Sequence, residues 1–121
     1  MEKNIVIVDD SESIREVVEF TLTNAGNKVK VAVDGEDALK YFDGSKIDLV
    51  VTDLYMPKKD GIELIKEIRK KEDYKFVPII FLSTESQQAK KDEAKAAGAT
   101  GWIVKPFVPE KLLAAMKKVI R

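Results

Sequence analysis

Four short apolar runs are each followed by side chains that could do chemistry. Asp9 and Asp10 follow "NIVIV", Asp53 follows "DLVVT", Ser83 follows "PIIFL" and Lys105 follows "GWIV". An ionised carboxylate is costly to bury without a partner, so an acid that closes an apolar run needs an explanation. Taken alone, each residue has an ordinary one: a polar strand end, a loop cap, a helix cap or a solvated lysine. The repetition of the pattern favours one shared site.

Three carboxylates in one pocket repel each other and raise one another's pKa. A divalent cation and a nearby ammonium would relieve that repulsion. Mg²⁺ prefers oxygen ligands and leaves room for phosphate oxygens, so we expect Mg²⁺, with Mn²⁺ as an alternative. Asp53, lying between the metal and Lys105, would be an oxygen nucleophile that attacks phosphorus. Phosphoryl transfer needs mainly positioning and charge neutralisation, which the metal, Lys105 and the Ser83 hydroxyl would supply.

The composition excludes several other kinds of site. The chain has 121 residues and contains no Cys and no His, which rules out disulfides, Ser-His triads and His-ligated zinc. Lys and Arg number 21, as do Asp and Glu, so the overall charge favours neither nucleic acid nor an anionic membrane. No apolar run is long enough for a signal peptide or a membrane span. We expect one cytoplasmic domain over residues 1–121, with no output domain.

Five Val- and Ile-rich runs of strand length recur, at 4–8, 28–33, 48–52, 78–82 and 101–104. Segments with helical periodicity or helix-favouring composition separate and follow them. In the first, Ser13 and Glu16 form a candidate capping box, with Ile14, Val17 and other apolar residues on one face. The alternation predicts an α/β fold with a parallel sheet covered by helices on both faces. In such sheets ligands bind beyond the carboxyl ends of the strands, where the polar residues lie.

The blocks "IVIVDDS", "VVTDLYMPKKDGIEL", "PIIFLSTES" and "GWIVKPF" resemble, in order and spacing, the receiver domain of bacterial two-component response regulators. The resemblance covers essentially the whole chain, and it is nearest to stand-alone chemotaxis receivers of the CheY-like type. It implies a doubly wound, flavodoxin-like (βα)5 sandwich with strand order 2-1-3-4-5. It also implies a signalling switch, not a stand-alone enzyme, that catalyses only its own phosphorylation and dephosphorylation.

The resemblance assigns a role to each position. Asp53 would be the phosphoacceptor, and Asp9, Asp10, Asp53 and the Tyr55 backbone carbonyl would hold the metal. Ser83 would be the switch hydroxyl and Lys105 the phosphate-contacting lysine, aimed inward by a cis bond to Pro106. Trp102 occupies the place of a rotating aromatic, which we expect to turn into the space that Ser83 leaves.

The family likeness also implies partners. A histidine kinase would donate the phosphoryl group. A flagellar motor switch protein, or another target, would bind the face formed by the fourth helix, fifth strand and fifth helix. A phosphatase is a further expected partner, and we expect the domain to be a monomer.

Two positions depart from the common pattern of the family and are expected to tune dephosphorylation. Tyr55 lies two residues after Asp53, where many relatives carry Asn or another small polar group. Its ring would hinder the water that attacks the acyl phosphate, so we expect slow self-dephosphorylation. Glu85, two residues after Ser83, could steer or repel that water, or could be a solvated charge at a helix start.

Other functions remain open at this point. One is a receiver in a phosphorelay unrelated to chemotaxis. A haloacid-dehalogenase-type hydrolase would place its nucleophile in a D-x-D motif at the first strand, which "VDDSES" lacks. A flavodoxin-like cofactor binder would need a Gly- and hydroxyl-rich first loop, and the acidic "DDSE" would repel phosphate. A receiver-like protein that works only by protein contact is disfavoured by the presence of Asp53 and Lys105.

Overall fold

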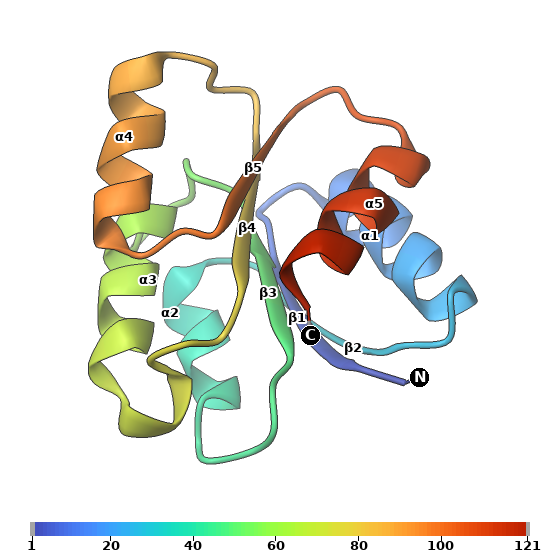
Figure 1. The fold of residues 1–121 in the computed structure, drawn as a ribbon, viewed down its shortest axis with the longest axis horizontal. Helices are drawn as coiled ribbons and strands as arrows, with labels where there is room; N and C mark the ends of the chain where they lie inside the picture. Colours follow the sequence, from blue (N-terminus) through green and yellow to red (C-terminus); the bar gives the residue numbers. More distant parts are fainter. Residues whose placement is uncertain (1, 121) are drawn as a thin grey trace.

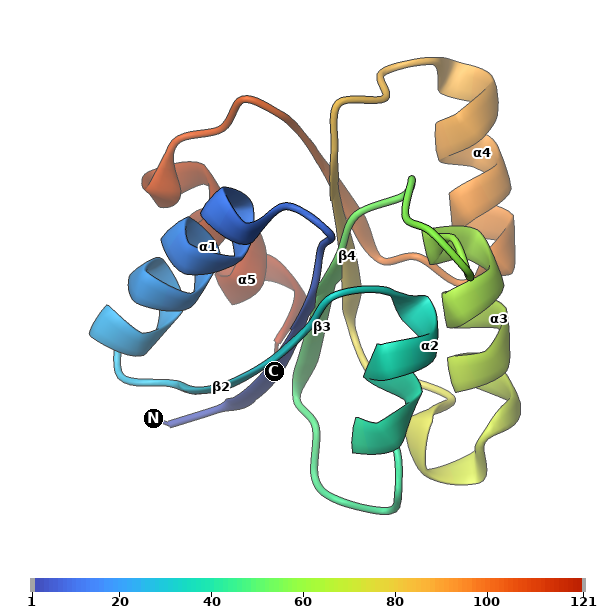
Figure 2. The ribbon, with the colours of Figure 1, turned by 180° about the vertical axis from the view of Figure 1, so that it is seen from behind.

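The structure, a computed structural model, describes residues 2–120, so Met1 and Arg121 at the ends of the expected domain lie outside the described residues. Five parallel strands form one sheet in the order β2-β1-β3-β4-β5, as predicted (Figures 1 and 2). The strands are β1 (Asn4–Val8), β2 (Lys28–Ala32), β3 (Leu49–Thr52), β4 (Ile79–Ser83) and β5 (Gly101–Val104). The apolar runs therefore located every strand to within one residue at each end.

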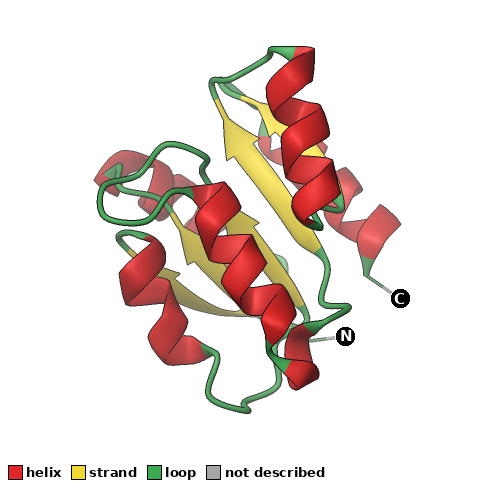
Figure 3. Cartoon of the chain, turned by 90° about the vertical axis from the view of Figure 1, so that its left-hand side faces the viewer, coloured by secondary structure: helices red, strands yellow, loops and turns green. Residues whose placement is uncertain are grey.

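Helices cover both faces of the sheet. On one face lie α1 (Glu12–Asn24) and α5 (Pro109–Val119); on the other lie α2 (Gly35–Ala38), α3 (Gly61–Lys70) and α4 (Gln88–Ala97) (Figures 1 and 3). Two 3₁₀ turns, η1 (Leu39–Tyr41) and η2 (Glu72–Tyr74), follow α2 and α3. None of the helices within residues 2–120 is both long and apolar enough to cross a membrane.

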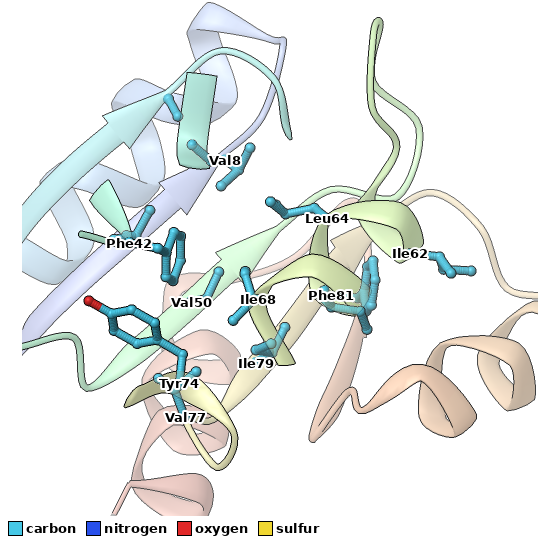
Figure 4. Close-up of a cluster of buried hydrophobic side chains, with 14 of the residues drawn as sticks. Val8, Phe42, Val50, Ile62, Leu64, Ile68, Tyr74, Val77, Ile79 and Phe81 are labelled. Atoms are coloured by element: carbon cyan, nitrogen blue, oxygen red, sulfur yellow. The ribbon is translucent and has the colours of Figure 1, made fainter. Parts of the chain in front are cut away.

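The sheet separates two apolar cores. Along β1, Val6 and Val8 belong to the core under α2, α3 and α4, whereas Ile5 and Ile7 belong to the core under α1 and α5. Figure 4 shows the first of these clusters, in which Phe81 from β4 packs among residues of β3 and α3. Every residue of β3 and β4 is buried. Strands buried on both faces have few polar positions, which is why these strands are apolar up to Thr52 and Ser83 at their carboxyl ends.

Two expectations about α1 are wrong. Its N-cap is Ser11, whose side chain accepts a hydrogen bond from the Ile14 N–H, so Ser13 lies inside the helix instead of capping it. The Asp9 carboxylate accepts the Ser11 N–H at 2.9 Å, and this contact turns the chain before Ser13. In addition, Val17 is 45% exposed, because α1 turns Val18 and Leu22 toward the sheet instead.

The start of α3 is held against the carboxyl end of β3. Asp60 and Glu63 form a capping box in which each side chain accepts the other's backbone N–H. At Gly61, which begins the helix, an added Cβ would lie 2.4 Å from the Asp53 carbonyl oxygen and 2.5 Å from Phe81 Cε1. Only glycine fits so close an approach, which places the helix directly behind Asp53.

Candidate functional site

Sheet register brings the two buried acids side by side. Val8 of β1 pairs with Thr52 of β3, and the next residues along the two strands are Asp9 and Asp53. The Asp53 N–H continues the ladder by donating to the Val8 carbonyl at 2.9 Å. Because side chains at the ends of paired parallel strands share one sheet edge, both carboxylates emerge at the same place.

Asp10 completes a cluster of three carboxylates. Each of Asp9, Asp10 and Asp53 offers an oxygen atom, and these oxygens all lie within 4.8 Å of one another. Asp9 and Asp53 are buried, at 2% and 9% exposure, while Asp10 lies on the solvent side. The cluster consists of hard oxygen ligands with one open side, which fits a hydrated Mg²⁺ ion.

Lys105 supplies the cation that the two buried acids share. The register of β5 on β4 places it next to Ser83, whose carbonyl accepts the Lys105 N–H at 2.8 Å. Its Nζ then lies 2.8 Å from Asp9 Oδ2 and 3.2 Å from Asp53 Oδ2. The bond between Lys105 and Pro106 is cis, as the resemblance implied.

The site carries more negative than positive charge, and the pKa values of both Lys105 and Asp9 are raised. Burial lowers the pKa of Lys105, but its hydrogen bond to Asp9 and the charges of Asp9 and Asp53 outweigh burial, so the pKa is raised overall. Burial raises the pKa of Asp9 despite the hydrogen bond from Lys105, and the charge of Asp53 raises it further. The site sets three carboxylates against one ammonium, a charge balance that favours a divalent cation.

Asp53 is oriented by two donors. Its Oδ1 accepts the Leu54 N–H at 2.7 Å, and its Oδ2 accepts from Lys105. A carboxylate held at both oxygens presents one defined edge to an incoming group, which is what an attacking oxygen needs.

Ser83 and Trp102 meet at Glu85, away from the acids. Ser83 is fully buried, and within residues 2–120 its hydroxyl bonds to the Glu85 N–H at 3.2 Å and not to the carboxylates. The Trp102 indole N–H donates to the Glu85 carbonyl at 3.0 Å, and its ring stacks on Phe81 with centroids 5.1 Å apart. Trp102 therefore already packs inward in this structure.

The Tyr55 side chain also reaches Glu85. Its hydroxyl donates to Glu85 Oε1 and so joins the loop after β3 to the loop after β4. The shared hydrogen bond raises the pKa of Tyr55 and lowers that of Glu85. Half of the Tyr55 surface is exposed, so the ring lies at the edge of the site and not in the core.

Comparison with known proteins agrees with this geometry. The response regulator receiver domain family matches residues 5–117. The chain belongs to this family.

Several relatives of this receiver domain are known. The chemotaxis protein CheY4 of Vibrio cholerae is 44% identical, with a TM-score of 0.95 over 99% of this chain and 100% of that one. The receiver domain of the sensor histidine kinase PA1611 from Pseudomonas aeruginosa, solved with a magnesium ion coordinated in its active site cleft, is 27% identical, with a TM-score of 0.90 over 98% of each chain.

Among curated relatives, the alkaline phosphatase synthesis transcriptional regulatory protein PhoP of Bacillus subtilis is 37% identical over all of this chain and 50% of its own. The chain spans about half the length of the curated relatives it matches. As a receiver domain of a two-component response regulator, it implies a histidine kinase as phosphodonor and a downstream target.

Some contacts in this receiver domain were not foreseen from the sequence. The guanidinium of Arg15, the fourth residue of α1, donates to the Asp9 carbonyl at 2.8 Å and so ties α1 to the acidic loop. The sequence singled out Tyr55 and Glu85 separately, but nothing in it indicated that they bond to each other. Both contacts join segments that only folding brings together, and no local pattern marks them.

Proposed function

We propose that Asp53 is the phosphoacceptor of a phosphorylation-activated signalling switch. The observation that carries this proposal is the Lys105 ammonium, which bridges Asp9 and Asp53 beside the exposed Asp10. The proposed step is attack by an Asp53 oxygen on the phosphorus of a phosphohistidine in the kinase. The new O–P bond replaces the P–N bond, and the histidine nitrogen leaves with the bond's electron pair.

The remaining residues neutralise charge and hold the group. The Lys105 ammonium would contact an oxygen of the phosphoryl group on Asp53 while it stays close to Asp9. Asp9, Asp10, Asp53 and the Tyr55 carbonyl would hold Mg²⁺, or Mn²⁺ in its place. The bound metal supplies positive charge to the phosphoryl oxygens. The domain would catalyse only its own phosphorylation and dephosphorylation, in the cytoplasm where the kinase works.

The test is an intact-mass measurement after incubation with Mg²⁺ and acetyl phosphate. The parent protein should gain one phosphoryl group, and Asp53→Asn should gain none. Asp43→Asn is a matched control, since Asp43 is exposed and its hydrogen bonds among residues 2–120 are to Ser45 in its own turn, and it should gain the group like the parent. A parent that gains no mass with Mg²⁺ present, or an Asp53→Asn protein that still gains it, contradicts the proposal.

We further propose that the output face is formed by α4, β5 and α5, and that its target is the flagellar motor switch in chemotaxis. The 44% identity to CheY4 over 99% of this chain and all of that one supports this assignment. Trp102 and the 38%-exposed Val104 lie on β5, and Ala94 is the only residue of α4 that is buried. A helix with so little buried surface can shift at low cost.

A second candidate is control of transcription, because the curated relatives that match are transcriptional regulators. The two are separated by affinity capture with the domain in Mg²⁺, with and without beryllofluoride as a phosphoryl mimic. Capture of a motor switch protein only with the mimic supports chemotaxis. Capture of a transcription component only with the mimic, and no capture of a motor switch protein, favours the second candidate. The same capture would reveal a phosphatase, which we expect as a further partner.

A further inference from the structure

Glu85 is bonded through all four of its polar groups. Its backbone N–H donates to Ser83 Oγ, and its backbone carbonyl accepts from the Trp102 indole. Its carboxylate accepts the Tyr55 hydroxyl at one oxygen and the Gln87 N–H, at 3.0 Å, at the other. The loop after β3, the loop after β4 and strand β5 therefore meet at this one residue.

The position of the Tyr55 side chain depends on its hydrogen bond to Glu85. The ring is half exposed and is not among the residues of either apolar core. Hydrogen bonds to a charged acceptor are stronger than neutral ones, and here the acceptor is a carboxylate. The hydroxyl is thus the part of Tyr55 that fixes where its side chain lies, and its bond is one of the four that hold Glu85.

We propose that the Tyr55–Glu85 hydrogen bond is a latch between the two loops, which holds Ser83 and Trp102 in the positions seen here and so sets how readily the domain switches. Only the effect of the latch on switching rests on the proposed function. When Ser83 turns toward a phosphoryl group on Asp53, Glu85 moves with it, because the Glu85 N–H bonds to Ser83 Oγ. Movement of Glu85 breaks the bond to Tyr55, so the latch stabilises the unphosphorylated arrangement.

Trp102 makes the latch measurable, because it is the only tryptophan in the chain. Acrylamide quenching of its fluorescence reports how firmly the indole is held, without phosphodonor or metal. Tyr55→Phe and Glu85→Ala should each raise the quenching constant about twofold, and the double variant should raise it no further. Glu85→Gln should raise it less than Glu85→Ala does, because its one amide oxygen can still accept the Tyr55 hydroxyl but is uncharged and leaves the Gln87 N–H without its acceptor.

Tyr41→Phe is the matched control. It also deletes a tyrosine hydroxyl that donates to an oxygen, the Val31 carbonyl at 2.8 Å, but at the β2 edge of the sheet. It should leave the Trp102 quenching constant unchanged. If Tyr55→Phe behaves like the parent, or Tyr41→Phe raises quenching equally, the latch is overturned.

A second titration tests the effect on switching. With Mg²⁺ present, the concentration of beryllofluoride that half-completes the Trp102 fluorescence change should fall about fivefold in Tyr55→Phe, as expected for loss of one hydrogen bond in the starting state. An unchanged midpoint overturns the role in switching. Failure of the parent to take a phosphoryl group would instead contradict the proposed function, and it would leave the quenching result standing.

Discussion

The Lys105 ammonium lies 2.8 Å from Asp9 Oδ2, although 96 positions separate the two residues along the chain. The same nitrogen lies 3.2 Å from Asp53 Oδ2. Two buried carboxylates from adjacent strands thus depend on one cation from the far end of the sequence. The stability of the domain and its response to metal should both reflect this arrangement.

Replacing Lys105 with Met should destabilise the metal-free protein by about 3 kcal/mol, because it leaves two buried acids without their partner. Mg²⁺ should restore more stability to this variant than to the parent, since the metal then provides the missing positive charge. Urea unfolding with and without MgCl₂ measures both effects. Lys90→Met on α4, which removes an exposed i,i+3 pair with Glu93, should cost under about 0.5 kcal/mol. Equal losses in the two variants would show that Lys105 is not a shared partner of the acids.

Asp10→Asn should abolish most of the stabilisation that Mg²⁺ gives to the parent. A ligand at one hundred times its dissociation constant adds about 2.7 kcal/mol to the free energy of unfolding. Without metal the variant should be no less stable than the parent, because one of three repelling carboxylates is gone. Thermal unfolding in MgCl₂ and in a chelator measures this. Asp92→Asn, on the exposed side of α4, should keep the full Mg²⁺ effect, and the prediction is wrong if Asp10→Asn keeps it too.

Tyr55→Asn should speed the loss of the phosphoryl group about tenfold, which corresponds to ~1.4 kcal/mol in the barrier to attack by water. The physical reason is steric, since the aromatic ring lies two residues from Asp53 and is replaced by a smaller side chain. Decay of the phosphorylated mass after removal of phosphodonor gives the rate. Tyr55→Phe keeps the ring but loses the hydrogen bond that holds it, so its decay rate should lie between those of the parent and Tyr55→Asn. If Tyr55→Asn and the parent lose the phosphoryl group at the same rate, the Tyr55 ring does not exclude water.

Gly61→Ala should destabilise the domain by about 2 kcal/mol, because the added methyl group meets the Asp53 backbone and the Phe81 ring in a packed interior. It should also slow phosphorylation, since the collision displaces the backbone of the phosphoacceptor. Gly101→Ala is the control: its added Cβ would meet Ile80 Cγ1 at an ordinary 3.6 Å. Urea midpoints and phosphorylation rates of the two variants should differ clearly. Similar values would mean that the close approach at Gly61 has no consequence for the site.

Much of the fold follows from local patterns. Residues 79–82 of β4 are buried on both faces and are therefore all apolar, which the sequence displays directly. Helix starts are less evident, because several Ser and Asp residues can cap. Helix α1 is capped by Ser11 instead of the expected Ser13, since the Asp9 carboxylate accepts the Ser11 N–H, whereas the capping box at Asp60 and Glu63 was not predicted.

The sequence by itself determined that acids, a hydroxyl and a lysine would gather at one sheet edge, because parallel strands place their carboxyl ends together. The tertiary structure alone decided which of them touch. That Lys105 binds both Asp9 and Asp53, that Arg15 ties α1 to the Asp9 backbone, and that Tyr55 bonds to Glu85 depend on where neighbouring loops lie. Such contacts leave no local pattern, because a hydrogen bond between loops depends on positions to within a fraction of an ångström, and those positions are set by packing of the whole domain.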